Sequence, residues 1–181
     1  MECFVIFVMA WCWCNATESK SQNVSRNCMI EPLKTDNPKK IAEIFAEEYR
    51  KKGYNLDFSI NSLKIEIDLV LENEIPRNLD EREKLETELT AYFGETLCRL
   101  YDAEWKGSYY GFKNPNGVNF YTCRIQKNEF EFGPSHFFEY YFSNGKEDTG
   151  SFTDYLNFSY YFKGDKKYIT DGILKKINNF C

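Results

Sequence analysis

The sequence predicts an α+β domain in which N-terminal helices pack on an aromatic-rich antiparallel sheet, with a short helix at the C-terminus. Two observations lead to this class. Residues 78–105 carry apolar side chains at the spacing of a helix that lies on a core. After this segment the composition changes, because 21 of the 32 aromatic residues fall between Tyr101 and Tyr168, and aromatic residues favour strands. We expect a single α+β domain over residues 37–181.

Residues 78–105 are expected to form the central helix. Asn78 suits the N-cap, with Glu81 reaching back to it as in a capping box. A second, narrow face carries small residues, and a glycine inside a helix costs about 1 kcal/mol relative to alanine, so we expect a close helix contact at Gly94. The apolar face consists of Leu85, Leu89, Tyr92, Phe93, Thr96, Leu97 and Leu100, and the small-residue face of Thr87, Ala91, Gly94 and Cys98.

The small-residue face is the candidate functional site. We predict that it binds a protein partner or a second copy of the chain, with polar and aromatic side chains at its rim. The alternative is that Gly94 lies on a solvated surface. No catalytic, cofactor-binding or metal-binding residue is predicted. The proposed partner-binding residues are Ala91, Gly94, Glu95, Cys98, Tyr92 and Trp105.

Short motifs around this helix resemble those of an uncharacterised bacterial family. They are the run from Tyr92 to Glu95, with a Trp-Lys-Gly about ten residues later, and the upstream Asp57-Phe58-Ser59 and Ser62-Leu63. Family members have an aromatic-x-Gly-Glu helix followed by a strand that opens with Gly-Trp, whereas here Glu104 precedes the tryptophan. The resemblance covers roughly residues 55–143. It implies a fold and no assigned activity.

Two helices are expected before the central one. The first has Asp36 or Asn37 as its cap, Pro38 in its first turn and Gly53 after its end. Residues 59–75 fit two patterns, because apolar residues alternate as in a strand and also recur as in a helix. We predict a helix there. The alternating set is Leu63, Ile65, Ile67, Leu69 and Leu71, and the helical set is Ile60, Leu63, Ile67, Val70 and Leu71.

Short strands and helices are expected after the central helix. Residues 105–113 and 118–126 flank an Asn-Pro-Asn-Gly turn and predict a hairpin. Residues 128–132 predict a further strand, and residues 135–143 a helix capped by Ser135 and ended by Gly145. Residues 152–162 fit a strand or a helix. Residues 169–180 predict the terminal helix, with Ile173, Leu174 and Ile177 on one face.

The N-terminus reads as a leader. Residues 4–13 are apolar and have the length of a signal-peptide core, although no positive charge precedes them. We therefore expect residues 1–16 to be a signal or membrane-attachment segment and residues 17–36 to be a flexible, polar linker. This predicts an exported or cell-envelope-associated protein. The alternative is a cytoplasmic protein.

Charge and cysteine content exclude several classes. The net charge of −5 and the pI of about 5.1 argue against nucleic-acid binding. Seven cysteines occur without CxxC spacing, and with one histidine they do not suggest structural zinc. Once the leader is removed, four cysteines remain that could pair in an oxidising compartment, although buried thiols are favoured at Cys98 and Cys123. The four are Cys28, Cys98, Cys123 and Cys181.

Three functions follow, and the first is preferred: a non-catalytic protein that binds a protein partner. The second is a carbohydrate- or cell-envelope-binding module, because a sheet with one covered face would leave some tyrosines outward. The third is a hydrolase around His136, with Cys98 or Cys123 as the nucleophile. Glu95 and Glu104 could also be drawn as paired carboxylates, but acidic residues are so abundant that such a pair is weak evidence. The tyrosine pairs are Tyr109–Tyr110, Tyr140–Tyr141 and Tyr160–Tyr161.

Overall fold

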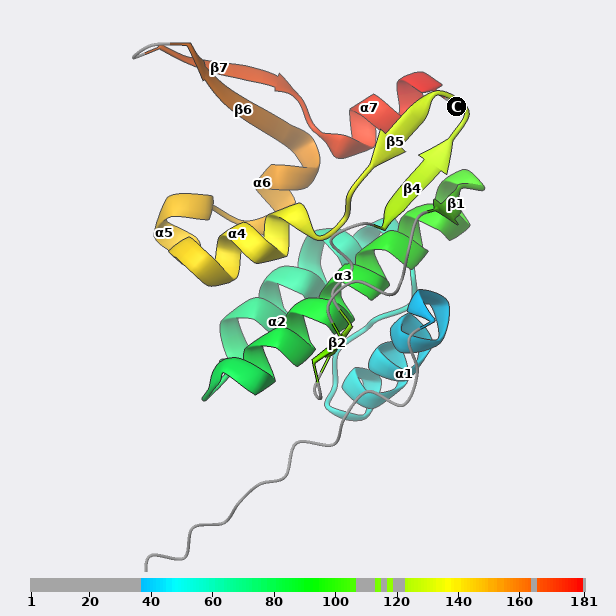
Figure 1. The fold of residues 1–181 in the computed structure, drawn as a ribbon, viewed down its shortest axis with the longest axis vertical. Helices are drawn as coiled ribbons and strands as arrows, with labels where there is room; N and C mark the ends of the chain where they lie inside the picture. Colours follow the sequence, from blue (N-terminus) through cyan, green and yellow to red (C-terminus); the bar gives the residue numbers. More distant parts are fainter. Residues whose placement is uncertain (1–36, 107–112, 115–116, 119–122, 164–165, 181) are drawn as a thin grey trace, which may run out of the picture.

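The computed structural model describes residues 37–106, 113–114, 117–118, 123–163 and 166–180 (Figure 1). The expected leader, the linker and the Tyr109–Tyr110 pair lie outside these residues. The helices are α1 (Pro38–Lys51), the π-helix η1 (Ser62–Glu66), α2 (Ile67–Asn73), α3 (Leu79–Tyr101), α4 (His136–Asn144), α5 (Lys146–Thr149), α6 (Phe152–Asn157) and α7 (Ile173–Phe180). The strands are β1 (Glu104–Lys106), β2 (Lys113–Asn114), β3 (Gly117–Val118), β4 (Arg124–Lys127), β5 (Phe130–Phe132), β6 (Phe158–Lys163) and β7 (Lys166–Asp171).

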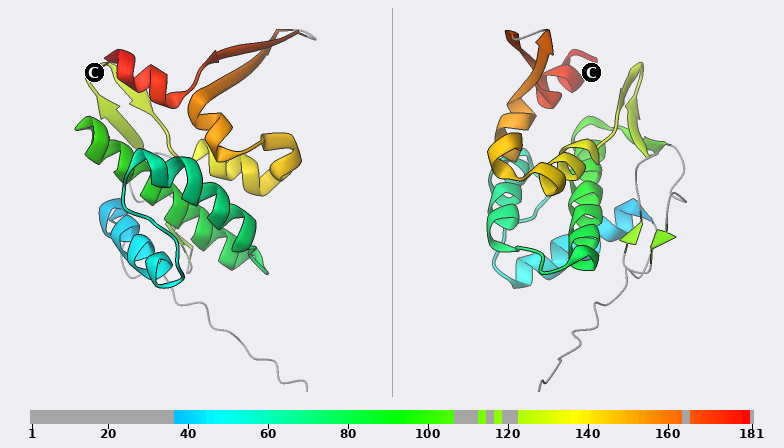
Figure 2. Two further views of the ribbon diagram at one scale, coloured as in Figure 1. Left: turned by 180° about the vertical axis from the view of Figure 1, so that it is seen from behind. Right: turned by 60° about the vertical axis from the view of Figure 1, so that its left-hand side comes forward.

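The α+β class is confirmed. The strands form a three-stranded antiparallel sheet in the order β1-β4-β5 and two separate antiparallel pairs, β2-β3 and β6-β7. Trp105 lies opposite Ile125, and Ile125 lies opposite Phe132. The described ends of the predicted hairpin pair as expected, because β1 pairs with β4 and β2 pairs with β3. Helices α1, α2 and α3 lie together, and the three-stranded sheet lies near the C-terminal end of α3 (Figures 1 and 2).

The central helix begins as predicted and ends earlier. The Asn78 side chain accepts a hydrogen bond from the Glu81 amide at 2.9 Å. The capping box is wrong in one detail, because Glu81 accepts from the Arg77 amide at 2.8 Å rather than from Asn78. Asp102 takes the left-handed conformation at the C-cap, with φ of 52°, and so ends the helix before β1.

Both faces of α3 are buried. The predicted apolar face is confirmed from Leu85 to Leu97, whereas Leu100, in the last turn, is 40% exposed and was wrongly assigned to it. On the small-residue face Ala91 and Gly94 are also buried. Helix α1 packs on α3, and α4, β1, β3 and β4 contact it too. The helix is therefore surrounded by the rest of the chain along its middle turns.

The segment predicted as a helix over residues 59–75 is helical from residue 60 to residue 73. The helical set wins because Leu63, Ile67 and Val70 are fully buried, whereas Ile65 and Leu69 of the alternating set are exposed. The first turns form the π-helix η1, and its Lys64 carbonyl accepts the Thr153 hydroxyl. This bond joins η1 to the start of α6.

An aspartate of α2 holds the same end of α6. The Asp68 carboxylate accepts from the Phe152 amide at 2.6 Å and from the Thr153 amide at 3.0 Å. It also accepts from the Thr153 hydroxyl at 2.7 Å. The first amides of a helix have no partner inside the helix, so a carboxylate from another element serves here as the cap.

A buried tyrosine joins α3 to the turn before η1. Tyr92 is fully buried, and its hydroxyl accepts from the Phe58 amide at 3.0 Å and lies 2.6 Å from the Ser62 hydroxyl. Ser62 in turn donates to the Ser59 carbonyl at 2.8 Å. Phe58 has a φ of 61°, an unusual conformation for a bulky residue. The Tyr92 hydroxyl bonds the amide of this residue and helps to hold the turn.

The aromatic residues of the second half form a compact cluster around Phe93. Its ring makes edge contacts with Phe132, Phe138 and Phe152 at centroid distances of 5.6, 6.3 and 4.9 Å. Helix α4 is confirmed, but Ser135 makes no side-chain capping bond, so its predicted role is wrong. The rings therefore serve mainly as core between helices and not only as strand residues.

The C-terminal region contains more structure than expected. Residues 152–162 are both helix and strand, because α6 leads directly into β6. The terminal helix starts at Ile173 rather than at residue 169, since β7 continues to Asp171. Ile173 and Ile177 are buried, as predicted.

The burial of the apolar face of α3 predicts that alanine substitutions at Leu89 and Leu100 lower stability by different amounts. Leu89→Ala is expected to lower the free energy of unfolding by about 2 to 5 kcal/mol, because Leu89 is fully buried and its truncation leaves a cavity. Leu100→Ala is the matched control and should change it by about 0.5 kcal/mol or less. Urea unfolding of both variants measures this. Equal effects would contradict the assigned faces.

Candidate functional site

The predicted close contact at Gly94 is present, but a tryptophan ring makes it rather than another helix. A methyl group placed on Gly94 would lie 2.2 Å from Cη2 of Trp105 and 3.2 Å from Cδ1 of Ile125. Only a glycine leaves room for the indole at its present depth. The alternative of a solvated Gly94 is wrong, because the residue is buried. The strand pair β1-β4 therefore lies directly on the helix backbone.

Glu95, the neighbour of Gly94, fixes the same indole. Its carboxylate is buried and accepts from Nε1 of Trp105 at 3.3 Å and from Nε of Arg99 at 2.8 Å. Arg99 also donates to Glu43 of α1 at 3.0 Å, and its guanidinium lies 3.8 Å from the ring centroid of Phe58. One glutamate thus links the sheet, α3 and, through Arg99, α1.

The six predicted site residues come together, mostly inside the fold. Ala91, Tyr92, Gly94 and Glu95 are buried, while Cys98 and Trp105 are half-buried. Their role in partner binding stays a prediction. The packing limits it, because a partner of the folded domain could reach only the half-buried pair unless the sheet moved away.

Sequence reasoning missed three members of this cluster: Glu43, Phe58 and Arg99. Each lies on a different element, and the Arg99–Glu43 bond spans 56 positions. The only local signal was the four-residue spacing of Glu95 and Arg99, which places them on one helix face. Both oxygens of Glu95 accept hydrogen bonds, so the cluster has the character of a structural link.

Two further carboxyl groups of α3 are unusual. Burial raises the pKa of Glu88 to about 7, while Lys84, at 3.7 Å, acts in the opposite direction. Burial likewise raises the pKa of Glu86 to about 7, with a further contribution from the negative charge of Glu139. These groups bear on stability, because a pKa that differs between the folded and the unfolded chain makes the free energy of unfolding depend on pH.

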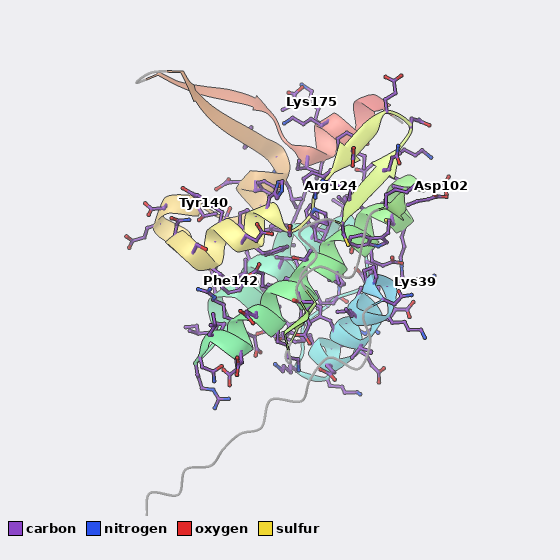
Figure 3. All side chains as sticks on the ribbon, in the orientation of Figure 1. Lys39, Asp102, Arg124, Tyr140, Phe142 and Lys175 are labelled. Atoms are coloured by element: carbon purple, nitrogen blue, oxygen red, sulfur yellow. The ribbon has the colours of Figure 1, made fainter. Side chains whose placement is uncertain are left out.

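The cysteines and the histidine do not form a nucleophilic site in the described part of the chain. Burial raises the pKa values of the Cys98 and Cys123 thiols to about 12 and about 11. High pKa values leave little thiolate near neutral pH. His136 is exposed, and its Nε2 would lie 3.4 Å from a methyl group placed on Gly133. Figure 3 places Arg124 near the passage from β5 to α4.

The other suggested features are also separated. The Glu104 carboxylate pairs with Lys106 at 2.9 Å, whereas Glu95 is buried against Arg99. Tyr140 and Tyr141 lie on α4 and not on a sheet, so the argument from strand alternation does not apply to them. Tyr140 is 53% exposed at the molecular surface (Figure 3).

Comparisons with known proteins gave no match: no family model, no curated protein and no solved structure resembles the chain closely enough. The resemblance to a bacterial family therefore stays a prediction. Within the described ranges, none of the helices combines the length and apolar character needed to cross a membrane. The functional argument consequently rests on geometry.

The Gly94 contact predicts that Gly94→Ala changes stability in opposite directions in the wild-type protein and in a Trp105→Ala variant. Gly94→Ala should destabilise the wild-type domain by about 1 to 3 kcal/mol, because the new methyl group overlaps the Trp105 ring. In a Trp105→Ala background the same change should stabilise by up to about 1 kcal/mol, since alanine is the better helix former. Thermal and urea unfolding of the four proteins measure the coupling. The same effect in both backgrounds would contradict the contact.

The raised pKa of Glu88 predicts a pH dependence. The folded chain holds this proton more tightly than the unfolded chain, whose value is near 4.5, so the stabilising contribution is complete below pH 4.5 and is lost as the pH rises toward about 7. Glu88→Gln should therefore gain stability relative to wild type over this range, by roughly 1 to 3 kcal/mol. Urea unfolding from pH 4.5 to 8 tests this, with the same substitution at the exposed Glu129 as the control. A flat difference for Glu88→Gln would contradict the assignment.

Proposed function

We propose that this chain is a non-catalytic protein-binding domain whose binding element is the β6–β7 hairpin. The observation that carries the proposal is the position of this hairpin. It stands away from the helical body in all three views (Figures 1 and 2). Within the described residues β6 and β7 pair only with each other, so both outer edges lack a neighbouring strand.

An unpaired strand edge is a template for another extended chain. Every second residue of an edge strand directs its backbone N–H and C=O groups outward, and an added strand satisfies them. Soluble proteins usually cover or shorten such edges. Here each strand is six residues long, from Phe158 to Lys163 and from Lys166 to Asp171. This length is ample for recognition by strand addition.

The base of the hairpin is held firmly. The Gly172 amide donates to the Asn157 carbonyl at 3.1 Å. A methyl group placed on Gly172 would lie 2.3 Å from the Asn157 carbonyl carbon and 2.5 Å from the Phe158 nitrogen. Because the obstacles are backbone atoms, only glycine permits this approach. The two ends of the hairpin are therefore held together at α6 and α7. This is consistent with a hairpin whose orientation relative to these helices is fixed.

Site-specific photo-crosslinking in native cells tests the proposal. A benzoylphenylalanine placed at Tyr161 of β6 should form a covalent adduct with a protein. A second copy of the chain is one candidate for that protein. The matched control carries the same group at Ile75, which is 75% exposed in the connection between α2 and α3. Adducts specific to position 161 are expected. Identical products from both positions, or none from the hairpin, would contradict the proposed function.

A further inference from the structure

The β6–β7 hairpin (Phe158–Asp171), called the arm below, has no third strand among the residues that the structure describes. A two-stranded hairpin is only marginally stable in water, and three or more strands or a packed helix are needed for independent stability. Apart from pairing with each other, β6 contacts mainly α6 and β7 contacts mainly α7, the elements next to each in sequence. Beyond its base, no other described helix or strand makes an extensive contact with the hairpin. An added strand would supply what is missing.

The two edges of the arm differ in charge. Strand β7 carries Lys166 and Lys167 at one end and Asp171 at the other. Charged residues, lysine above all, are the usual means by which proteins discourage strand addition at an edge. Strand β6 has no charged residue from Phe158 through Phe162. The β6 edge is therefore the open one.

The β6 sequence is compatible with pairing to itself. Lys163 and Lys166 pair across two intervening residues, and the closing pair of such a hairpin is hydrogen-bonded, after which the pattern alternates. Phe158, Tyr160 and Phe162 then direct their backbone groups to the outer edge. A two-fold axis at Tyr160 would place Phe158 opposite Phe162 of a second copy, and aromatic cross-strand pairs are favourable.

The charges along the arm favour the same antiparallel arrangement. Residues 163–167 at its tip include three lysines and one aspartate, so this end is positive on balance. Asp171 and the exposed Asp154 lie at its base, where Asp171 also pairs with Lys175 at 2.8 Å. In an antiparallel pair the tip of one arm lies near the base of the other. The two charge groups would then approach one another, although each chain has a net charge of −5. The tip lysines are Lys163, Lys166 and Lys167.

From these observations we infer that the arm's occupant is a second copy of this chain, so that two β6 strands pair antiparallel about a two-fold axis at Tyr160 and form a four-stranded sheet. The inference rests on the proposed function, because it names the protein that the arm binds. It also assigns the specificity to β6 rather than to β7. The interface is isologous, so it closes at the dimer.

Matched lysine substitutions of the full chain test the inference. Tyr160→Lys places two like charges on the two-fold axis, whereas Ile169→Lys adds the same charge at the directly opposite position of β7. Sedimentation equilibrium from micromolar to near-millimolar protein should show a dimer for wild type and for Ile169→Lys. Tyr160→Lys should raise the dissociation constant by about tenfold or more. Circular dichroism confirms that both variants remain folded.

Three outcomes would overturn the inference. The first is a wild-type chain that stays monomeric throughout, and the second is a dimer that Tyr160→Lys leaves unchanged. The third is a monomer whose arm binds vesicles containing phosphatidylserine, which would assign the lysines and aromatic residues to a lipid surface. If the wild-type chain is monomeric but position 161 still crosslinks to another protein, the proposed function stands and only the identity of the partner is wrong.

Discussion

The ring of Trp105 lies on the backbone of α3 at Gly94, and this contact decides where the small sheet can sit. Glu95, the next residue, accepts a hydrogen bond from the indole and another from Arg99, which extends the link to Glu43 of α1. The glycine admits the ring and the glutamate orients it. Helix α3 is consequently packed on its small-residue face as well as on its apolar face.

This arrangement changes the interpretation of the small-residue face of α3. From the sequence alone, such a face is equally compatible with binding a partner and with packing inside the chain's own fold. Here Ala91 and Gly94 are covered from within, so this face primarily attaches the sheet to the helix. The surface that we propose for association lies elsewhere, on the arm that leaves the body between α6 and α7 (Figure 2). A closely packed centre around α3 and a two-stranded arm are therefore the two contrasting parts of the described structure.

Much of the architecture could be predicted from local patterns. The caps at Asn37 and Asn78, the apolar face of α3 and the helical set of residues 59–75 depend on neighbouring positions, and the structure confirms them. The close contact at Gly94 was also predictable, because an interior glycine needs a reason. The identity of the covering group could not be predicted, since Trp105 reaches Gly94 by way of the turn at Asp102 and a strand pairing.

The remaining errors have related causes. Asp68 caps α6 across 84 positions, and Glu43 meets Arg99 across 56, so neither pair leaves a local signal. The aromatic-rich half was expected to be mainly strand, yet Phe137, Phe138 and Phe152 pack from helices, because aromatic rings fill helix interfaces as readily as sheet faces. The arm was missed as a unit, since residues 152–162 pass from helix to strand within one continuous aromatic segment.

Amide hydrogen exchange at two protein concentrations tests the central contrast most directly. The amides from Leu89 to Leu97 should exchange only on global unfolding and at the same rate in both samples. The amides of Phe158, Tyr160 and Phe162 should exchange quickly in the dilute sample and slow markedly in the concentrated one, as a second β6 strand covers them. Two results would contradict the account of a closely packed centre and a self-pairing arm. One is fast exchange in the middle of α3, and the other is an exchange rate of the arm amides that is the same at both protein concentrations.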